Sequence, residues 1–311
     1  MAIPTGTLTQ ISSMQNLVQS AYDQYVRMAL RSIPVMRALA DVKPVQQAMP
    51  GSSVVFSIYS DLATATGTLT ETSDVSSIAL GNPSQVTVTL NEYGSAVTTT
   101  KKLNLTSFND VDAALADIIA YNAADSIDSV VASVLTGGTN VIYGGAATGT
   151  NSITSSGTIT SANIRKAVVQ LRSNKAVPRI GELYAAYLHP RQSADLRAES
   201  GTGGFQELTK YVDRTPFVAG AVGVLEGAFI VETPRVPSAA NTQSPAVTVY
   251  SAVVAGREAL AEALVQDTSV VIGPEIDALR RFRTIGWYTF AGWNRLREAS
   301  LYRIETATSI N

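Results

Sequence analysis

Alternating apolar and polar positions predict the first elements of this chain, a pair of strands that flank a polar segment. Apolar residues lie at alternate positions in residues 54–58 and again in residues 86–90, and threonine, serine and glycine dominate the stretch between them. A period of two is typical of half-buried strands, so the pattern predicts a long two-stranded arm. A lone hairpin of this length is only marginally stable in water, and we therefore expect it to pack against another surface.

Apolar positions with helical spacing predict a long helix over residues 108–136. Leu115 and Ile119 fall within one arc of this helix, whereas Ile127 and Val134 fall on a shifted arc, so we expect its two halves to pack against different partners. Residues 109–110 can cap its start, and Gly137 ends it. At ~1.5 Å per residue such a helix is about 40 Å long, which is the length of a strut.

The rest of the chain is predicted to be mixed helix and strand. Recurring apolar residues predict a helix over 14–33 that Pro34 ends, and a turn follows at 49–51. Residues 137–160 have the composition of a loop or loose hairpin, and a further helix is expected from Ser161 to about Ser173. Pro190 is well placed to begin another helix after a buried strand. Further strands are expected within 183–188, 227–231, 247–250 and 281–306.

Composition points to extensive burial between subunits. Hydrophobic residues make up 45% of the 311 residues, and charged residues make up only 15%, against roughly 25% in typical soluble domains. We expect no apolar run long enough to span a membrane, so the low charge is best explained by surface that other subunits cover. A merely alanine- and threonine-rich soluble protein is the alternative.

The residues that enzymes and metal sites use are scarce. The chain has no cysteine and one histidine, which excludes disulfides, thiol nucleophiles and histidine-rich metal sites. No nucleophile elbow or phosphate-binding glycine motif is present, and the glycines at 201–204 and 220–227 have the spacing of flexible loops. We expect His189 to hydrogen-bond a neighbouring loop at a strand end. We predict no catalytic residue, no cofactor and no metal.

Acidic residues mark two places. Asp117, Asp125 and Asp128, together with Asp110, lie close to one stripe of the long helix, which we interpret as a solvated face because their axial separations are too large for one metal ion. The second place is the arm. Between Lys43 and Lys101 there is no lysine or arginine, although the stretch contains acids, and we expect this acidic arm to lie on a basic surface. The acids are Asp61, Glu71, Asp74 and Glu92.

Basic residues gather near the second helix and near the end of the chain. We predict that one of these clusters receives the acidic arm of another subunit, in preference to single-stranded nucleic acid, because the overall charge is −2. The candidate intersubunit contacts in these clusters are Arg165, Lys166, Arg172, Arg280, Arg281 and Arg283.

The order of parts resembles the major capsid proteins of tailed bacteriophages with the Hong Kong 97-type fold. Three stretches carry the resemblance. The first joins Glu92-Tyr93-Gly94 to the helix around residues 122–128, the second runs from Leu188-His189-Pro190 through residues 220–233, and the third contains Gly286-Trp287 and the closing Ile304-Glu305. An arm, a strut helix, an α/β region and long terminal strands follow one another in the same order. The expected fold class is therefore α+β.

The resemblance implies a domain division and a function. Residues 1–47 would be an N-terminal arm and 48–100 an extended loop that overlaps a neighbour. Residues 101–160 and 281–311 would form a peripheral domain with its spine helix, and 161–280 an axial domain. Many copies would close, as pentamers and hexamers, into an icosahedral shell around double-stranded DNA, with no membrane involved. The shell would be assembled in the host cytoplasm, and the acidic stripe of the spine helix would then face the packaged polyanion.

Two departures from the family refine this expectation. Some members carry a cleaved N-terminal scaffold region, for which this chain has no room before the arm, so we expect a separate scaffolding protein besides a portal. Some members also link a loop lysine to a neighbour's asparagine, which an arm without lysine cannot do, so we expect non-covalent overlap or a cement protein. Two rivals stay open: an encapsulin-type cellular compartment, and a hydrolase that uses carboxylates such as Glu182 and Asp195.

Overall fold

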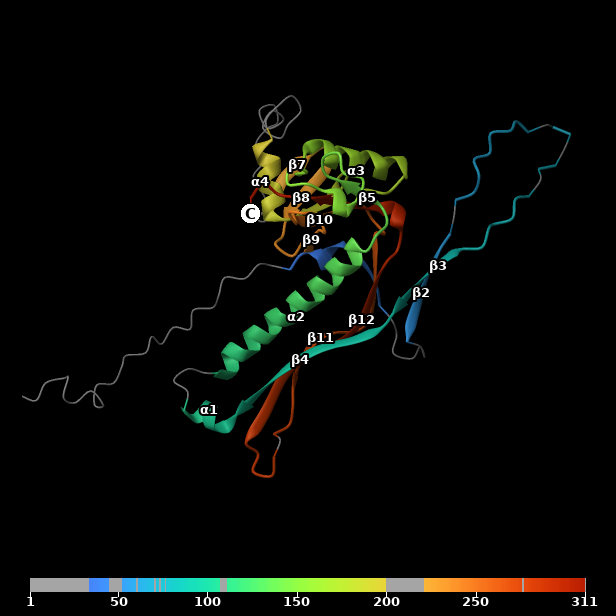
Figure 1. Ribbon diagram of the computed structural model, residues 1–311. Coiled ribbons are helices and arrows are strands. Elements are labelled where there is room, and N and C mark those ends of the chain that lie inside the picture. Colours follow the sequence, from blue (N-terminus) through green and yellow to red (C-terminus); the bar gives the residue numbers. More distant parts are fainter. Residues whose placement is uncertain are drawn as a thin grey trace, which may run out of the picture.

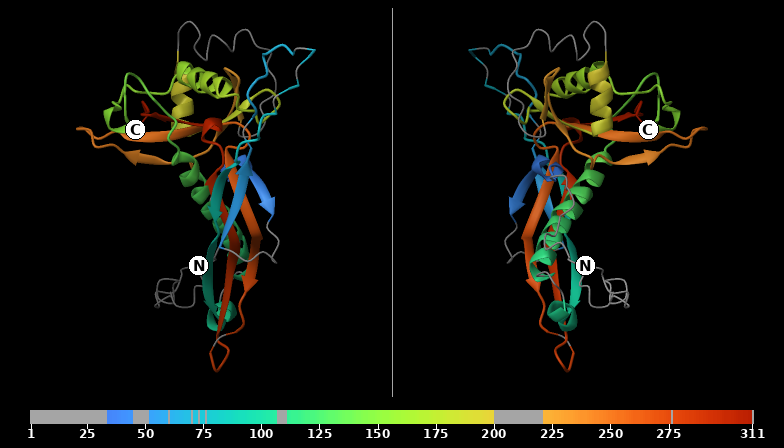
Figure 2. Two further views of the ribbon diagram at one scale, coloured as in Figure 1. Left: turned by 90° about the vertical axis from the view of Figure 1, so that its right-hand side faces the viewer. Right: turned by 90° about the vertical axis from the view of Figure 1, so that its left-hand side faces the viewer.

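The molecule is elongated, with two sheets at an angle, a long helix between them and an arm that projects to one side (Figures 1 and 2). The helix predicted over 14–33, the turn at 49–51, the caps at 109–110 and the glycine loop at 201–204 all lie outside the described residues. The computed structural model describes residues 34–44, 52–59, 61–69, 71–72, 74–75, 77–106, 111–199, 221–275 and 277–310.

A four-stranded sheet forms the long stem of the molecule. Its strand order is β1-β11-β12-β4, with β1 parallel to β11 and the other neighbours antiparallel. The long terminal strands predicted from residue 281 onward are confirmed by β12. The strands are β1 (Ala40–Pro44), β4 (Asn91–Thr100), β11 (Leu260–Ile272) and β12 (Phe282–Arg295).

A seven-stranded sheet lies across one end of the stem. Its order is β5-β13-β10-β6-β8-β7, and β9 pairs with β10. The buried strand predicted over 183–188 is confirmed, because every residue of β6 is buried. The expected loop or loose hairpin over 137–160 differs in one respect: β5 pairs in parallel with β13 and so joins this sheet. The strands are β5 (Val141–Tyr143), β6 (Tyr184–Leu188), β7 (Ala221–Leu225), β8 (Ala228–Glu232), β9 (Ser238–Ala240), β10 (Thr248–Ala255) and β13 (Leu301–Thr306).

Two of the predicted helices pack on the seven-stranded sheet, and both are confirmed. Helix α3 (Ser161–Ser173) inserts Ile164, Val168 and Leu171 into the core of this sheet. Helix α4 (Pro190–Ala198) begins with proline directly after β6. The shorter elements are α1 (Lys101–Thr106) and the 3-10 helices η3 (Met36–Leu39), η4 (Thr150–Ser152) and η5 (Glu298–Ser300).

Helix α2 (Val111–Thr136) connects the two sheets, and its two halves have different partners, as the shifted arcs predict (Figure 1). Leu115 and Ile119 pack with Trp287 on one face of the four-stranded sheet. Ile127 and Leu135 pack in a second core cluster that contains residues of both sheets. The helix is therefore the strut that holds one sheet against the other.

By length and composition alone, the Leu115–Thr136 part of α2 could cross a membrane, which differs from the sequence expectation that no apolar run is long enough. The core helix of a folded domain has the same composition. In this chain the helix packs on two sheets and contains a buried aspartate, so its apolar residues are explained by the core.

The interpretation of the acidic stripe as a solvated face is wrong for Asp128. Its side chain is 0% exposed, and it accepts hydrogen bonds from the backbone N–H groups of Met36 at 2.7 Å, Arg37 at 3.1 Å and Val35 at 3.3 Å. The carboxylate satisfies the free N–H groups at the start of η3, a role that helix starts commonly give to aspartate. Asp128 cannot then face a packaged polyanion.

The sheets do not follow the predicted domain boundaries. Strand β11 lies in the predicted axial segment but pairs with β12 of the stem, whereas β13 lies in the predicted peripheral segment but pairs with β10. Similarly, β4 falls in the predicted extended loop yet pairs with β12 along its full length. Chain order cannot show these pairings, because hydrogen bonding joins strands that are distant in sequence. The division into domains itself stays a prediction.

Candidate subunit interface

The arm consists of two paired strands and an extended tip. Strands β2 (Ser53–Ile58) and β3 (Ser84–Thr89) are antiparallel, with Ser53 opposite Thr89 and Ile58 opposite Ser84. Apolar side chains of this pair, including Phe56 and Val88, pack on β11 and β12 in one cluster. The base of the arm therefore rests on the molecule's own four-stranded sheet, which supplies the support that a lone hairpin needs.

Beyond Ile58 and Ser84 the described part of the arm pairs with no strand and is almost entirely exposed to solvent. Large apolar side chains project from it, and Leu69 is the most exposed of them at 77%. Such a concentration of exposed apolar side chains is typical of a surface that a partner covers. The exposed apolar residues are Tyr59, Leu62, Leu69, Val75, Ile78 and Leu80.

Three of the four predicted arm acids are on this tip. Asp61, Glu71 and Asp74 are exposed, and Asp74 accepts a hydrogen bond from the backbone N–H of its neighbour Val75 at 2.8 Å. Glu92 differs, because it lies on β4 in the four-stranded sheet. Burial and the neighbouring Glu92 carboxylate both raise the pKa of Tyr288. Glu92 is therefore part of the sheet surface and not part of the arm tip.

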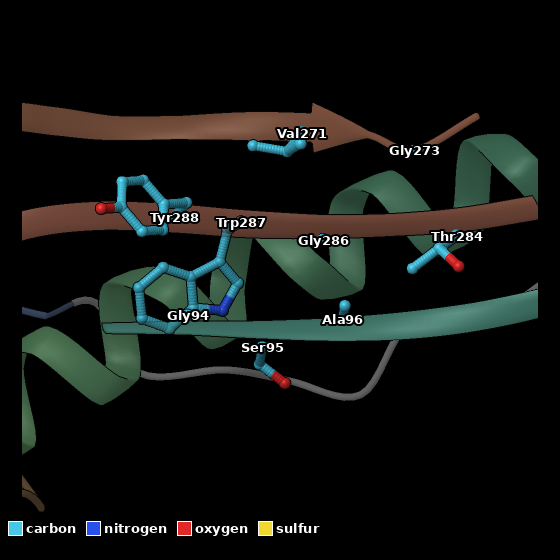
Figure 3. Close-up of a pocket in the computed structure, with 9 residues that line it drawn as sticks. All are labelled: Gly94, Ser95, Ala96, Val271, Gly273, Thr284, Gly286, Trp287 and Tyr288. Atoms are coloured by element: carbon cyan, nitrogen blue, oxygen red, sulfur yellow. The ribbon is translucent and has the colours of Figure 1, made fainter. Parts of the chain in front are cut away.

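The four-stranded sheet has a groove on the face opposite α2, in the half that is farther from the seven-stranded sheet (Figure 3). This groove has a volume of about 410 Å³, and small residues such as Gly94, Ala96 and Gly286 form its floor. Added Cβ atoms at Gly94 and Gly286 would lie 2.7 Å from backbone oxygens of the adjacent strand. The missing side chains leave the backbone open to close approach by another chain.

The predicted terminal basic cluster lies at the end of the four-stranded sheet where β12 begins. A smaller cavity of about 110 Å³ is lined by Lys101, Glu275, Arg280, Arg281 and Arg283. Arg281 is already paired with Asp277 at 2.5 Å, and Arg280 is exposed. The structure thus brings the three predicted arginines together with Lys101, which was not among the predicted contacts.

The other basic cluster lies on α3, and part of its charge is already neutralised. Arg165 forms an ion pair with Glu226 at 2.7 Å. The hydrogen bond between them raises the pKa of Arg165 and lowers the pKa of Glu226. Lys166 and Arg172 are exposed on the same helix. The two predicted basic clusters are therefore on different parts of the molecule, one on each sheet.

His189 has a structural role, at the end of a strand as expected. Its Nδ1 accepts a hydrogen bond from the backbone N–H of Arg191 at 3.2 Å, which caps α4, and its ring contacts that of Tyr250 with centroids 4.5 Å apart. Burial, together with the nearby Arg191 cation, lowers the pKa of His189. The residue caps its own helix in place of binding a neighbouring loop.

The carboxylates named for a hydrolase do not form a common site. Asp195 is buried and accepts hydrogen bonds from the backbone N–H of Ser309 at 3.0 Å and from its hydroxyl group. Glu182 is exposed between α3 and β6. Asp195 thus holds the end of the chain against α4. Among the described residues no group of acids or histidine has the arrangement of a metal site.

Sequence reasoning missed the partly buried ion pairs that join distant segments. Glu262 on β11 is 0% exposed and binds the Arg37 guanidinium at 2.6 Å, and this hydrogen bond raises the pKa of Arg37. Arg235 binds the carboxylate of Asp125 and donates to the Tyr121 hydroxyl at 2.6 Å. The acid Glu262 within the apolar run of residues 260–265 was the available signal.

Comparisons with known proteins agree with this architecture. The capsid of Ralstonia phage GP4 matches with a TM-score of 0.74 and 16% identity, covering 97% of this chain and 98% of that chain. The cyanophage Pam1 capsid matches with a TM-score of 0.68 and 13% identity over 95% and 98%. The capsid of a native GTA particle matches with a TM-score of 0.65 and 16% identity over 97% and 100%.

These likenesses show that the fold is the Hong Kong 97-type capsid fold. A comparison with curated protein sequences finds no significant match. The profile of the family described as phage capsid protein matches residues 9–310, which is nearly the whole chain. This protein therefore belongs to the phage capsid protein family and is a structural component of a phage capsid.

Proposed function

We propose that this chain is the major capsid protein of a tailed phage, which assembles as pentamers and hexamers into an icosahedral shell around double-stranded DNA. The observation that carries the proposal is the arm: an extended segment with exposed apolar side chains that its own chain leaves uncovered throughout the described residues. Repetition over a closed shell lets individually weak contacts of this kind add up, since several neighbours hold each subunit.

The cellular setting belongs to the same proposal. The shell is assembled in the host cytoplasm with a separate scaffolding protein and a portal, and a cement protein is a further candidate partner. The protein is not an enzyme, and it encloses DNA without reading its sequence. The encapsulin alternative is not proposed, because the family profile that matches the chain is that of phage capsids.

Within the shell, we assign the arm to the four-stranded sheet of a neighbouring copy. The arm tip offers apolar side chains and the acids Asp61, Glu71 and Asp74. The sheet offers a groove with an apolar floor and, as a separate cavity at its end, the basic residues Lys101 and Arg280. The acids of the arm and the basic residues of the neighbouring sheet would fix the direction in which the arm lies on that sheet. The α3 cluster is the second candidate receiver, although Glu226 already neutralises Arg165.

Electron microscopy of the expressed protein tests the main proposal. Shells or capsomer rings are expected, whereas uniformly small globules at high protein concentration would refute it. The charge match is tested by Glu71→Lys/Asp74→Lys, which should weaken assembly most at low salt, where screening is least. A double variant of equal charge change away from the arm, Asp117→Lys/Glu182→Lys, is the matched control. Equal assembly of both double variants across a salt series would reject the electrostatic assignment.

A further inference from the structure

Strand β4 forms one edge of the four-stranded sheet. It pairs with β12 on one side, and the described residues place no strand on its other side. Most of its ten residues are exposed. At ~3.3 Å per residue this edge is about 33 Å long. A long, exposed edge strand presents unpaired backbone groups that favour pairing with another chain. We therefore expect another chain to pair with an edge of this size.

The register identifies which backbone groups point outward. The N–H of Lys101 donates to the carbonyl oxygen of Arg281 at 2.8 Å, and the pairing from Thr100 back to Asn91 has no bulge. Because antiparallel residues alternate between bonded and non-bonded pairs, every second residue of β4 directs its N–H and C=O away from β12. These outward residues are Glu92, Gly94, Ala96, Thr98 and Thr100.

The segment that fits this edge is the arm tip of a second copy. Between Ile58 and Ser84 each side of the arm has about twelve residues, which extend about 40 Å and so match the length of β4. The molecule's own arm cannot reach this edge. Strands β3 and β4 follow one another in the chain and run away from the arm tip, so the tip and the Lys101 end lie at opposite ends of that line (Figure 1).

The side chains along β4 favour the same occupant. Gly94 and Ala96 lie at the groove, so their small size leaves room for a large residue of an added strand beside them (Figure 3). The arm supplies Leu69, Val75 and Ile78, all exposed. Large residues beside edge glycines stabilise strand pairs. The edge also ends at Lys101 and Lys102, which suit the acids of the arm.

We propose that the arm of a second copy adds a strand to the free edge of β4, so that backbone hydrogen bonds between copies carry the contact. The groove then receives every second side chain of the added strand, which makes the match selective. This inference rests on the proposed function, because it specifies how the arm engages its neighbour. It is distinct from a contact in which the arm only lies across the sheet.

A proline at an outward position tests the backbone bonds. Ala96→Pro removes an N–H that faces away from β12, so the sheet keeps its own bonds, and proline is tolerated on edge strands for this reason. Ala96→Ser keeps the N–H and is the matched control. We expect Ala96→Pro to raise the protein concentration needed for assembly roughly tenfold, with thermal unfolding of the unassembled subunit like that of Ala96→Ser. Thr98→Pro should act in the same way. Assembly of both proline variants at the wild-type concentration would overturn the inference.

Cross-linking between copies gives an independent readout, because the chain has no native cysteine. Ala96→Cys is combined with single cysteines at successive positions along each side of the arm. Cross-strand partners lie within disulfide range on one face only, so cross-links should recur at every second arm position. Thr284→Cys, at the groove floor, is the control anchor. Strand addition would be overturned if the arm cysteines cross-linked more strongly to Thr284→Cys and showed no alternation along the arm. Absence of shells from the wild-type protein would instead refute the proposed function.

Discussion

The buried carboxylate of Asp128 should be among the largest single polar contributions to the stability of the subunit. We consider Asp128→Ala, which leaves three backbone N–H groups at the start of η3 without their acceptor. Two of these bonds, at 2.7 Å and 3.1 Å, have good length. Hydrogen bonds to a charged group contribute ~1.5–3 kcal/mol each, which gives about 3–6 kcal/mol before compensation.

Two effects reduce this value. The variant no longer desolvates a carboxylate, and alanine has a higher helix propensity than aspartate by ~0.5 kcal/mol. We therefore expect the free energy of unfolding to fall by about 3 kcal/mol, which corresponds to a melting temperature lower by ~5 °C in a chain of this size. Urea unfolding of unassembled subunits, followed by tryptophan fluorescence, measures it.

Asp117→Ala is the matched control, because Asp117 lies on the same helix with an exposed side chain. Its effect should stay within ~0.5 kcal/mol. Asp128→Asn should fall between the two, since an amide oxygen can still accept one of the bonds. If Asp128→Ala and Asp117→Ala were equally stable, the carboxylate would not be the group that fastens η3 to α2, and the reasoning would be refuted.

Three further results are expected. Burial lowers the folded-state pKa of His189 below its ordinary value of 6.5. As the pH falls, the unfolded chain therefore takes up the proton first, and the stability of the subunit should fall below about pH 6.5. His189→Asn, which keeps a capping acceptor, should flatten this pH dependence in a series of melting curves. Gly292→Ala places a Cβ 2.2 Å from a backbone oxygen of β3, and limited proteolysis should then cut the arm faster, whereas an unchanged rate would contradict the close packing. Arg37→Ala leaves the buried Glu262 unpaired and should cost ~3 kcal/mol in urea unfolding, and adding Glu262→Gln should recover part of the loss.

The spacing of apolar residues predicted the helices and strands that bury one side along their length. The extents of α3, β6 and the start of α4 at Pro190 follow the predicted spans. The shifted arcs of α2 even predicted two different packing partners. Each of these features is local, because a helix or strand reports the side that it buries through the spacing of its own apolar residues.

Pairings between distant segments could not be predicted in this way. No strand was predicted over 260–272, and residues 301–306 were predicted only as part of the terminal strands. Nothing in either segment indicated that β11 joins the stem and β13 the other sheet. The candidate site shows the same limit. The terminal arginines were visible as a cluster, but their place beside Lys101 depends on β4 pairing with β12.

The pattern of residues along the chain is enough to predict the acidic, lysine-free arm, the long helix and the order of parts that carries the family resemblance. Which individual charges are buried depends on the tertiary structure. Asp117 and Asp128 share one stripe of one helix, yet the first is exposed and the second is buried. The difference arises because residues 35–37, some 90 positions earlier in the chain, bring their N–H groups to Asp128 alone. Such a contact depends on three-dimensional approach, which residue spacing does not record.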